Sequence, residues 1–176
     1  MTDKREVIKV EGAVADTQGR SLLERVGDYL ADKEWTFTRF EDKDCLVFTL
    51  RLRDGSVRVF VDTWEGAGWS RILVLTTYPT LVPEHRRAVV CEAITRINYV
   101  NIFGSFEMDM NDGELRTRAV LESDLRIGEE MIDRAIRKSL DLADQYQAAL
   151  LSIAFGNASA KDVLEMGARA EEGSVQ

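Results

Sequence analysis

The sequence predicts an α+β fold, an antiparallel β-sheet with helices packed on one face, and three observations lead to it. Apolar residues recur at helical spacing in three segments, apolar and polar residues alternate in two blocks, and glycine-containing turns divide both blocks. The resulting order is helix, three strands, helix, two strands, helix, which suits helices that cover the apolar face of a sheet. The 176 residues suit one domain. We place it at 18–156, after an N-terminal arm at 1–17 and before a short helix and tail at 157–176.

The first predicted element is a helix that begins at Ser21 and ends near Asp32. Ser21 and Glu24 have the spacing of a capping box, in which each side chain bonds the other residue's backbone N–H. Ahead of this helix, residues 1–15 mix charges with alternating apolar residues. This segment is expected either to form a short edge strand or to remain a mobile arm.

Three antiparallel strands are predicted between residues 44 and 78, where the apolar period changes to two. If Asp54-Gly55 forms a two-residue turn, Leu50 lies opposite Val59 and Phe48 opposite Val61. One face of the hairpin is then apolar along both strands.

The second turn of this block is predicted at Glu65–Gly68. A four-residue loop there places Trp64 opposite Trp69 and Asp62 opposite Arg71. Opposite charges then meet on the face that does not contact the helices.

The other face of the sheet is less polar than a solvated face should be. We expect it to be either an interface, with a second copy or another protein, or a face covered by the N-terminal arm or the C-terminal helix of the same subunit. The candidate interface residues are Val47, Phe60, Leu73 and Leu75, with Trp64 and Trp69 at one end.

A second helix is predicted over residues 83–100, with Pro83 as its first residue. A second hairpin follows over 102–121. A two-residue turn at Asp112-Gly113 sets Asp109 opposite Arg116 and Glu107 opposite Arg118, so we predict this register from its two charge pairs.

The longest helix is predicted over 129–153, with Asp133 and Arg137 spaced as an ion pair and Gly156 ending it. Ser159 and Asp162 then indicate a short C-terminal helix.

Composition argues against several classes of function. The net charge of −8 disfavours nucleic acid as a partner, and no apolar run is long enough for a membrane span. We expect a cytoplasmic protein that needs no metal or other cofactor. Cys45 and Cys91 lack metal-site spacing, and both are expected to be small buried hydrophobes. His85 is expected to be a solvated surface residue, so no catalytic residue is predicted.

Several motifs resemble the YbjN-like family. They are Arg96-Ile97-Asn98-Tyr99-Val100-Asn101, Gly104-Ser105-Phe106-Glu107-Met108-Asp109, Asp112-Gly113-Glu114-Leu115-Arg116-Thr117-Arg118, Asp144-Gln145-Tyr146 and Ala154-Phe155-Gly156. The resemblance covers roughly residues 18–156. It implies a fold similar to type III secretion chaperones, which act as homodimers that hold partner proteins, and a role as a sensory transduction regulator. The resemblance implies that the motif residues have structural roles and that none of them is catalytic.

Two hypotheses of function follow. The first is a non-enzymatic protein-interaction module, chaperone-like or regulatory, that acts as a homodimer and binds a protein partner. The alternative is a metabolite sensor whose ligand lies between the sheet and the helices, in a pocket bordered by Met108 and Met110.

Overall fold

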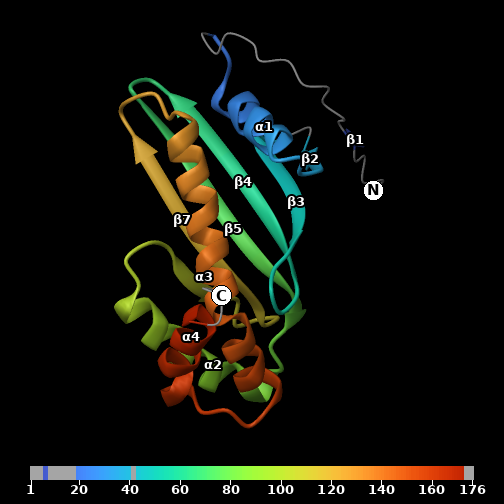
Figure 1. The fold of residues 1–176 in the computed structure, drawn as a ribbon, viewed down its shortest axis with the longest axis vertical. Helices are drawn as coiled ribbons and strands as arrows, with labels where there is room; N and C mark the ends of the chain where they lie inside the picture. The colour runs from blue at the N-terminus through green and yellow to red at the C-terminus, as the bar shows by residue number, and fades with distance from the viewer. Residues whose placement is uncertain (1–5, 8–18, 41–42, 173–176) are drawn as a thin grey trace.

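The computed structural model describes residues 6–7, 19–40 and 43–172 and confirms the α+β class. Its seven antiparallel strands form one sheet in the order β1-β2-β3-β4-β5-β7-β6 (Figure 1). The strands are β1 Glu6–Val7, β2 Phe37–Arg39, β3 Cys45–Arg51, β4 Ser56–Gly66, β5 Trp69–Leu81, β6 Ser105–Met108 and β7 Glu114–Ser123. The helices are α1 Leu22–Asp32, α2 Glu84–Val100, α3 Glu129–Phe155 and α4 Val163–Glu172, with a 3₁₀ turn, η1, at Ala160–Asp162.

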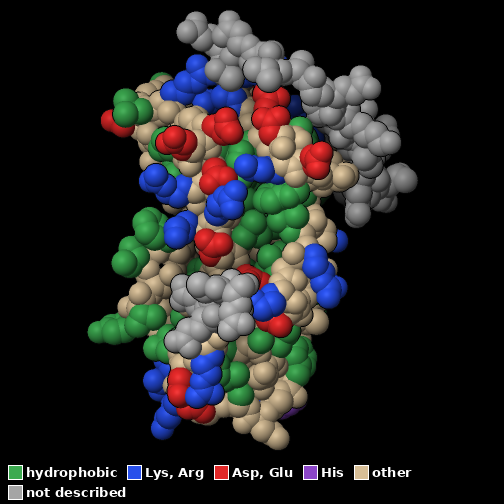
Figure 2. Space-filling model, in the orientation of Figure 1, with side chains coloured by type: hydrophobic (Ala, Val, Ile, Leu, Met, Phe, Trp, Pro, Cys, Tyr) green, Lys and Arg blue, Asp and Glu red, His purple; other side chains and the backbone are tan. Residues whose placement is uncertain are grey.

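The hydrophobic core lies between one face of the sheet and the helices. α3 runs along this face, α1 lies near one end of the sheet, and α2 and α4 lie near the other (Figure 1). Phe48, Val59 and Ile72 are buried here, as the alternation of β3, β4 and β5 predicts. On the outer surface of α3, side chains of both charges are interspersed (Figure 2).

The helix ends follow the sequence signals closely. The Ser21 hydroxyl accepts a hydrogen bond from the N–H of Glu24, whose carboxylate accepts one from the N–H of Ser21, so the capping box is confirmed. Pro83 is the N-cap of α2 rather than its first residue. α3 ends at Phe155, two residues later than predicted, with Gly156 as its C-cap.

The β3–β4 hairpin corrects the predicted register by two residues. Phe48 lies opposite Val59, and the N–H of Leu52 donates to the carbonyl of Gly55 at 2.7 Å, so the two turn residues are Arg53 and Asp54. A shift of two residues leaves every side chain on its face, so the apolar pattern could not detect it. The turn is fixed by a contact outside the hairpin, since Asp144 of α3 accepts hydrogen bonds from the N–H and guanidinium of Arg53, both at 2.9 Å.

The β4–β5 hairpin differs in the same way. Its turn is Ala67-Gly68, with Gly68 at φ +93°, and Trp64 lies opposite Arg71 rather than Trp69. The expected contacts form diagonally instead. The two indole rings have centroids 4.0 Å apart, and the guanidinium of Arg71 lies 3.0 Å from the carboxylate of Asp62.

The β6–β7 hairpin is also shifted by two, so the predicted two-residue turn is wrong. Glu107 lies opposite Arg116, and its carboxylate lies 3.0 Å from the guanidinium groups of both Arg116 and Arg118. Asp109 does not face Arg116. Its carboxylate accepts the N–H of Asn111 at 2.8 Å, and its carbonyl accepts the N–H of Gly113 at 2.8 Å. The connection therefore adopts a longer, side-chain-capped loop.

The N-terminal region contains two strands that add to the predicted three. β2 was not predicted, and it pairs with β3 so that Phe37 lies opposite Phe48. β1 pairs with β2, which confirms the edge-strand alternative at Glu6–Val7. The rest of the 1–15 segment lies outside the described residues.

The C-terminal helix is present and lies on the helical side of the sheet. Ser159 caps η1 by accepting the N–H of Lys161 at 3.2 Å. α4 packs against α3 and α2, so closely that a β-carbon at Gly167 would lie 2.2 Å from the ring of Tyr146. The alternative in which this helix covers the opposite face of the sheet is therefore wrong.

Candidate interaction surface

The face of the sheet that points away from the helices carries a continuous apolar surface. Strand register places Val47, Phe60 and Leu75 side by side across β3, β4 and β5, and places Leu73 beside Val120 of β7. Each of these side chains is half-buried or exposed. We call this side of the sheet the open face, and its apolar residues include all six predicted interface residues, Val47, Phe60, Trp64, Trp69, Leu73 and Leu75.

Arginines dominate the polar rim of the open face, although the chain as a whole is acidic. Alternation along the strands places five arginines on this face against four carboxylates, a local excess of one positive charge. Three of the arginines share ion pairs with three of the carboxylates. The charged set is Arg51, Arg58, Arg71, Arg116 and Arg118 with Asp62, Glu107, Glu114 and Glu122.

Two tryptophans close one end of the open face. The ring of Trp64 lies across Gly66, where a β-carbon would come within 1.9 Å of it, and against Trp69 at an interplanar angle of 33°. Both indoles are exposed by more than a third. Gly66 is thus required for this pair, which presents two aromatic surfaces to solvent.

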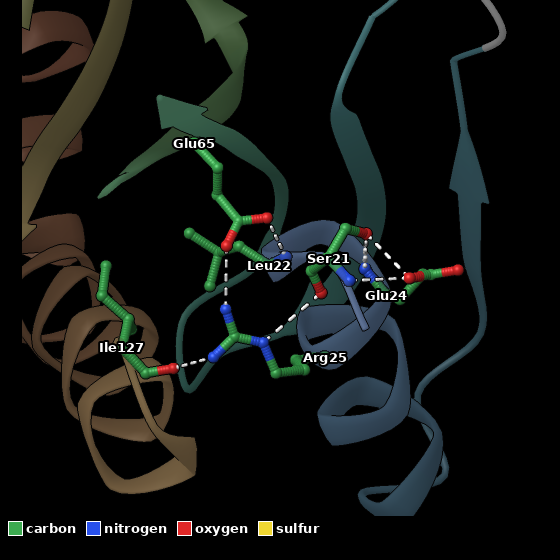
Figure 3. Close-up of polar contacts among 6 residues, drawn as sticks. All are labelled: Ser21, Leu22, Glu24, Arg25, Glu65 and Ile127. Atoms are coloured by element: carbon green, nitrogen blue, oxygen red, sulfur yellow. Dashed lines mark hydrogen bonds and ion pairs between the residues drawn. The ribbon is translucent and has the colours of Figure 1, made fainter. Parts of the chain in front are cut away.

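A buried arginine anchors this end of the sheet to the helices (Figure 3). The side chain of Arg25, on α1, is 8% exposed. Its guanidinium lies 3.1 Å from the carboxylate of Glu65, at the end of β4, and donates to the carbonyl of Ile127, ahead of α3. Glu65 also accepts the N–H of Leu22 at 2.5 Å, at the start of α1. The cluster joins three segments and holds the tip that carries the tryptophans.

Two residues of the motifs described above, Asn98 and Gly104, have structural roles at the β6 edge of the sheet. The amide of Asn98, in the last turns of α2, accepts the N–H of Phe106 at 2.8 Å and donates to its carbonyl at 3.0 Å. Gly104 has φ +75°, and a β-carbon there would lie 2.7 Å from the carbonyl oxygen of Arg118. The motif therefore specifies how α2 joins β6, and Asn98 takes the place of a neighbouring strand.

The candidate ligand pocket is not enclosed. Met108 packs against the core from β6, but Met110 is 54% exposed, and its sulfur lies 3.4 Å from that of Cys91. The two methionines therefore do not border a cavity between sheet and helices, and the metabolite-sensor hypothesis stays a prediction.

Other sequence candidates have ordinary surroundings. His85 is exposed, as expected, and Cys45 is buried, whereas Cys91 is only half-buried. Burial raises the pKa of the Cys45 thiol to about 11. No helix in the described part of the chain has both the length and the apolar character for crossing a membrane.

Sequence reasoning missed two contributors to this surface. Val120 extends the open face and is 51% exposed, and the alternation of β7 could have revealed it once β7 was placed beside β5. Arg25 gives no such signal, because its partners lie 40 and 102 residues away in the chain.

The comparison with protein families agrees with this architecture. A family model described as "Putative bacterial sensory transduction regulator" matches residues 22–152, which include α1, the strands from β2 to β7 with their three hairpins, α2 and most of α3. No curated protein matches the chain.

Proposed function

We propose, from the premise that the chain belongs to the YbjN family, that it is a non-enzymatic interaction module with a regulatory or chaperone-like role. It binds another protein on its open face and acts as a homodimer. The single observation that supports this most is the open face itself, where apolar side chains from four strands lie together and no helix among the described residues covers them. Exposed apolar patches with polar rims commonly mark protein interfaces.

The chemistry of the open face indicates which partner it would suit. Its centre at Phe60 and Leu73 offers apolar contact, and its arginines favour carboxylates on the partner. Arg58 has no ion-pair partner within the described residues, so it is available for such a contact. An acidic protein segment with apolar residues at alternate positions would match both features.

A site-specific cross-linking experiment tests this proposal. A photoreactive amino acid at Thr49, exposed on the open face, should capture a protein in cells, whereas the same amino acid at Thr95, exposed on α2, should not. The Phe60→Asp/Leu73→Asp variant should lose the adduct at Thr49, because two carboxylates in the apolar centre oppose burial of that face.

The control variant is Met110→Asp/Phe155→Asp, which changes two apolar residues away from the open face that are 54% and 55% exposed. It should keep the adduct. The proposal fails if the Phe60→Asp/Leu73→Asp protein, shown to be folded by its thermal melt, gives the same adduct in the same yield as the wild type.

A further inference from the structure

The outer edge of the sheet is formed by β6 along the first half of β7 and by β7 itself along the second half. β6 pairs with β7 only over Leu115–Arg118, whereas β7 continues to Ser123. Beyond Arg118, β7 is itself the margin of the sheet, and Figure 1 shows it there with no strand beside it. The segment Val120–Ser123 is called the open edge below.

The direction of the backbone groups at the open edge follows from the contacts of β6. The N–H and carbonyl of Phe106 both point outward, because both bond the amide of Asn98. The facing groups of Arg116 and Arg118 therefore point toward β6, and by alternation those of Val120 and Glu122 point off the sheet. No backbone partner for these groups occurs among the described residues. Asn98 closes the edge along β6, and no side chain in the described part of the chain does the same along β7.

We propose that the open edge pairs with the same edge of a second copy of this chain. In an antiparallel arrangement centred on Leu121, Val120 lies opposite the partner's Glu122, and Glu122 lies opposite the partner's Val120. The residues whose N–H and carbonyl groups point outward are then the ones that face each other, so four hydrogen bonds form around a two-fold axis.

Side chains on both sides of this axis are complementary. On the open face, Arg118 is the diagonal neighbour of the partner's Glu122, within reach of a long side chain, and the axis repeats this opposite-charge pair. A register that placed Glu122 opposite the partner's Glu122 would juxtapose like charges instead.

Apolar side chains beside the open edge supply further surface. The connection from α2 to β6 exposes a cluster that we call the apolar knuckle, and Figure 2 shows hydrophobic side chains projecting at this margin. Leu125, just beyond β7, is 74% exposed. Because antiparallel pairing brings the end of each β7 toward the start of the other copy's β6, the partner's Leu125 lies near this cluster. The apolar knuckle consists of Tyr99, Val100, Ile102 and Phe103.

This arrangement extends the homodimer part of the proposed function, on which it rests, by assigning the dimer a surface distinct from the open face. The two-fold axis is perpendicular to the joined sheet. Both open faces therefore point the same way and form one continuous surface. A partner protein and a second copy can therefore be bound at the same time.

Sedimentation velocity over a range of concentrations tests the edge with a matched pair of variants. Val120→Pro removes an N–H that points outward, so the pairing of β7 with β5 is kept while the open edge is blocked. Val120→Thr keeps that N–H. We expect the wild type and Val120→Thr to be dimers, and Val120→Pro to dissociate with a dissociation constant raised about tenfold or more.

A disulfide test gives a readout that does not depend on proline. In a Cys91→Ser background, Leu121→Cys should form a covalent dimer under mild oxidation, since residues that face each other across a non-hydrogen-bonded pair lie at about 4.5 Å between α-carbons. Thr49→Cys, on the open face, should not.

Three results would overturn the edge dimer. They are a monomer at every concentration, a dimer that Val120→Pro leaves intact while Phe60→Asp/Leu73→Asp abolishes it, and a covalent dimer from Thr49→Cys but not from Leu121→Cys. In each case the cross-link formed at Thr49 with another protein still reports separately on the open face, so failure of the edge is distinguishable from failure of the proposed function.

Discussion

Replacing Arg25 with methionine is expected to destabilise the fold by about 2–4 kcal/mol. Methionine keeps an apolar stem but lacks the guanidinium that bonds Glu65 and the carbonyl of Ile127. Each hydrogen bond to a charged group contributes about 1.5–3 kcal/mol. The expected loss of stability is smaller than the sum of these hydrogen bonds. Glu65 is 39% exposed and keeps its hydrogen bond from the N–H of Leu22, so in the variant its carboxylate is hydrated rather than buried and unpaired.

Urea unfolding followed by circular dichroism measures the loss. A change of 1 kcal/mol shifts the melting temperature of a protein of this size by about 2–4 °C, so Arg25→Met should melt about 5–15 °C below the wild type. Arg137→Met is the matched control. It removes an exposed cation that pairs with Asp133 four residues earlier on α3, and it should lower stability far less than Arg25→Met, because solvent screens an exposed pair.

The reasoning is refuted if the two variants lose the same stability. A double-mutant cycle with Glu65→Gln sharpens the result, since Arg25 and Glu65 should show a coupling free energy of about 1 kcal/mol or more. Additive effects would mean that the guanidinium acts through the carbonyls of Ser21 and Ile127 and not through Glu65.

Three further predictions concern single residues. Gly113→Ala should cost about 2 kcal/mol or more in a thermal melt, because Gly113 has φ +87° and a β-carbon there would lie 2.2 Å from a carbonyl oxygen; an unchanged melt would contradict the contact. The hydrogen bond from Arg137 lowers the pKa of Asp133, so the stability that this carboxylate contributes is present at pH 5 and is lost as the pH falls below about 4. Urea midpoints of Asp133→Asn should therefore fall less between pH 5 and pH 3 than those of the wild type, and equal falls would count against the pair. In a Cys91→Ser background, Cys45 should react slowly with iodoacetamide at pH 8, because its pKa is raised to about 11; urea should accelerate the reaction, and rapid labelling of the folded protein would show that the thiol is not buried.

The sequence predicted which face each strand residue occupies far better than which residue lies opposite it. Phe48 and Val59 are buried as expected, although the expected partner of Phe48 was Val61. All three hairpins are displaced from prediction by two residues, the smallest shift that keeps the faces unchanged. The choice among such registers depends on tertiary contacts of the turns, such as Arg53 with Asp144, which no local pattern encodes.

The candidate interface residues were found because the period of two identifies both faces of a strand. The elements that sequence reasoning missed are those whose partners are distant or whose length is short. β2 has three residues, too few for a periodic signal. Asn98 was recognised as part of a motif, but its bonds to Phe106 appear only once α2 and β6 are side by side.

The amide of Asn98 has a consequence for how likeness among relatives should be interpreted. A motif that joins a helix to a strand and closes the edge of a sheet determines the fold and does not select a binding partner. Relatives that share the motif are expected to share the fold. Their partner specificity would then depend on the side chains of β4 and β5, which can differ from one bacterium to another.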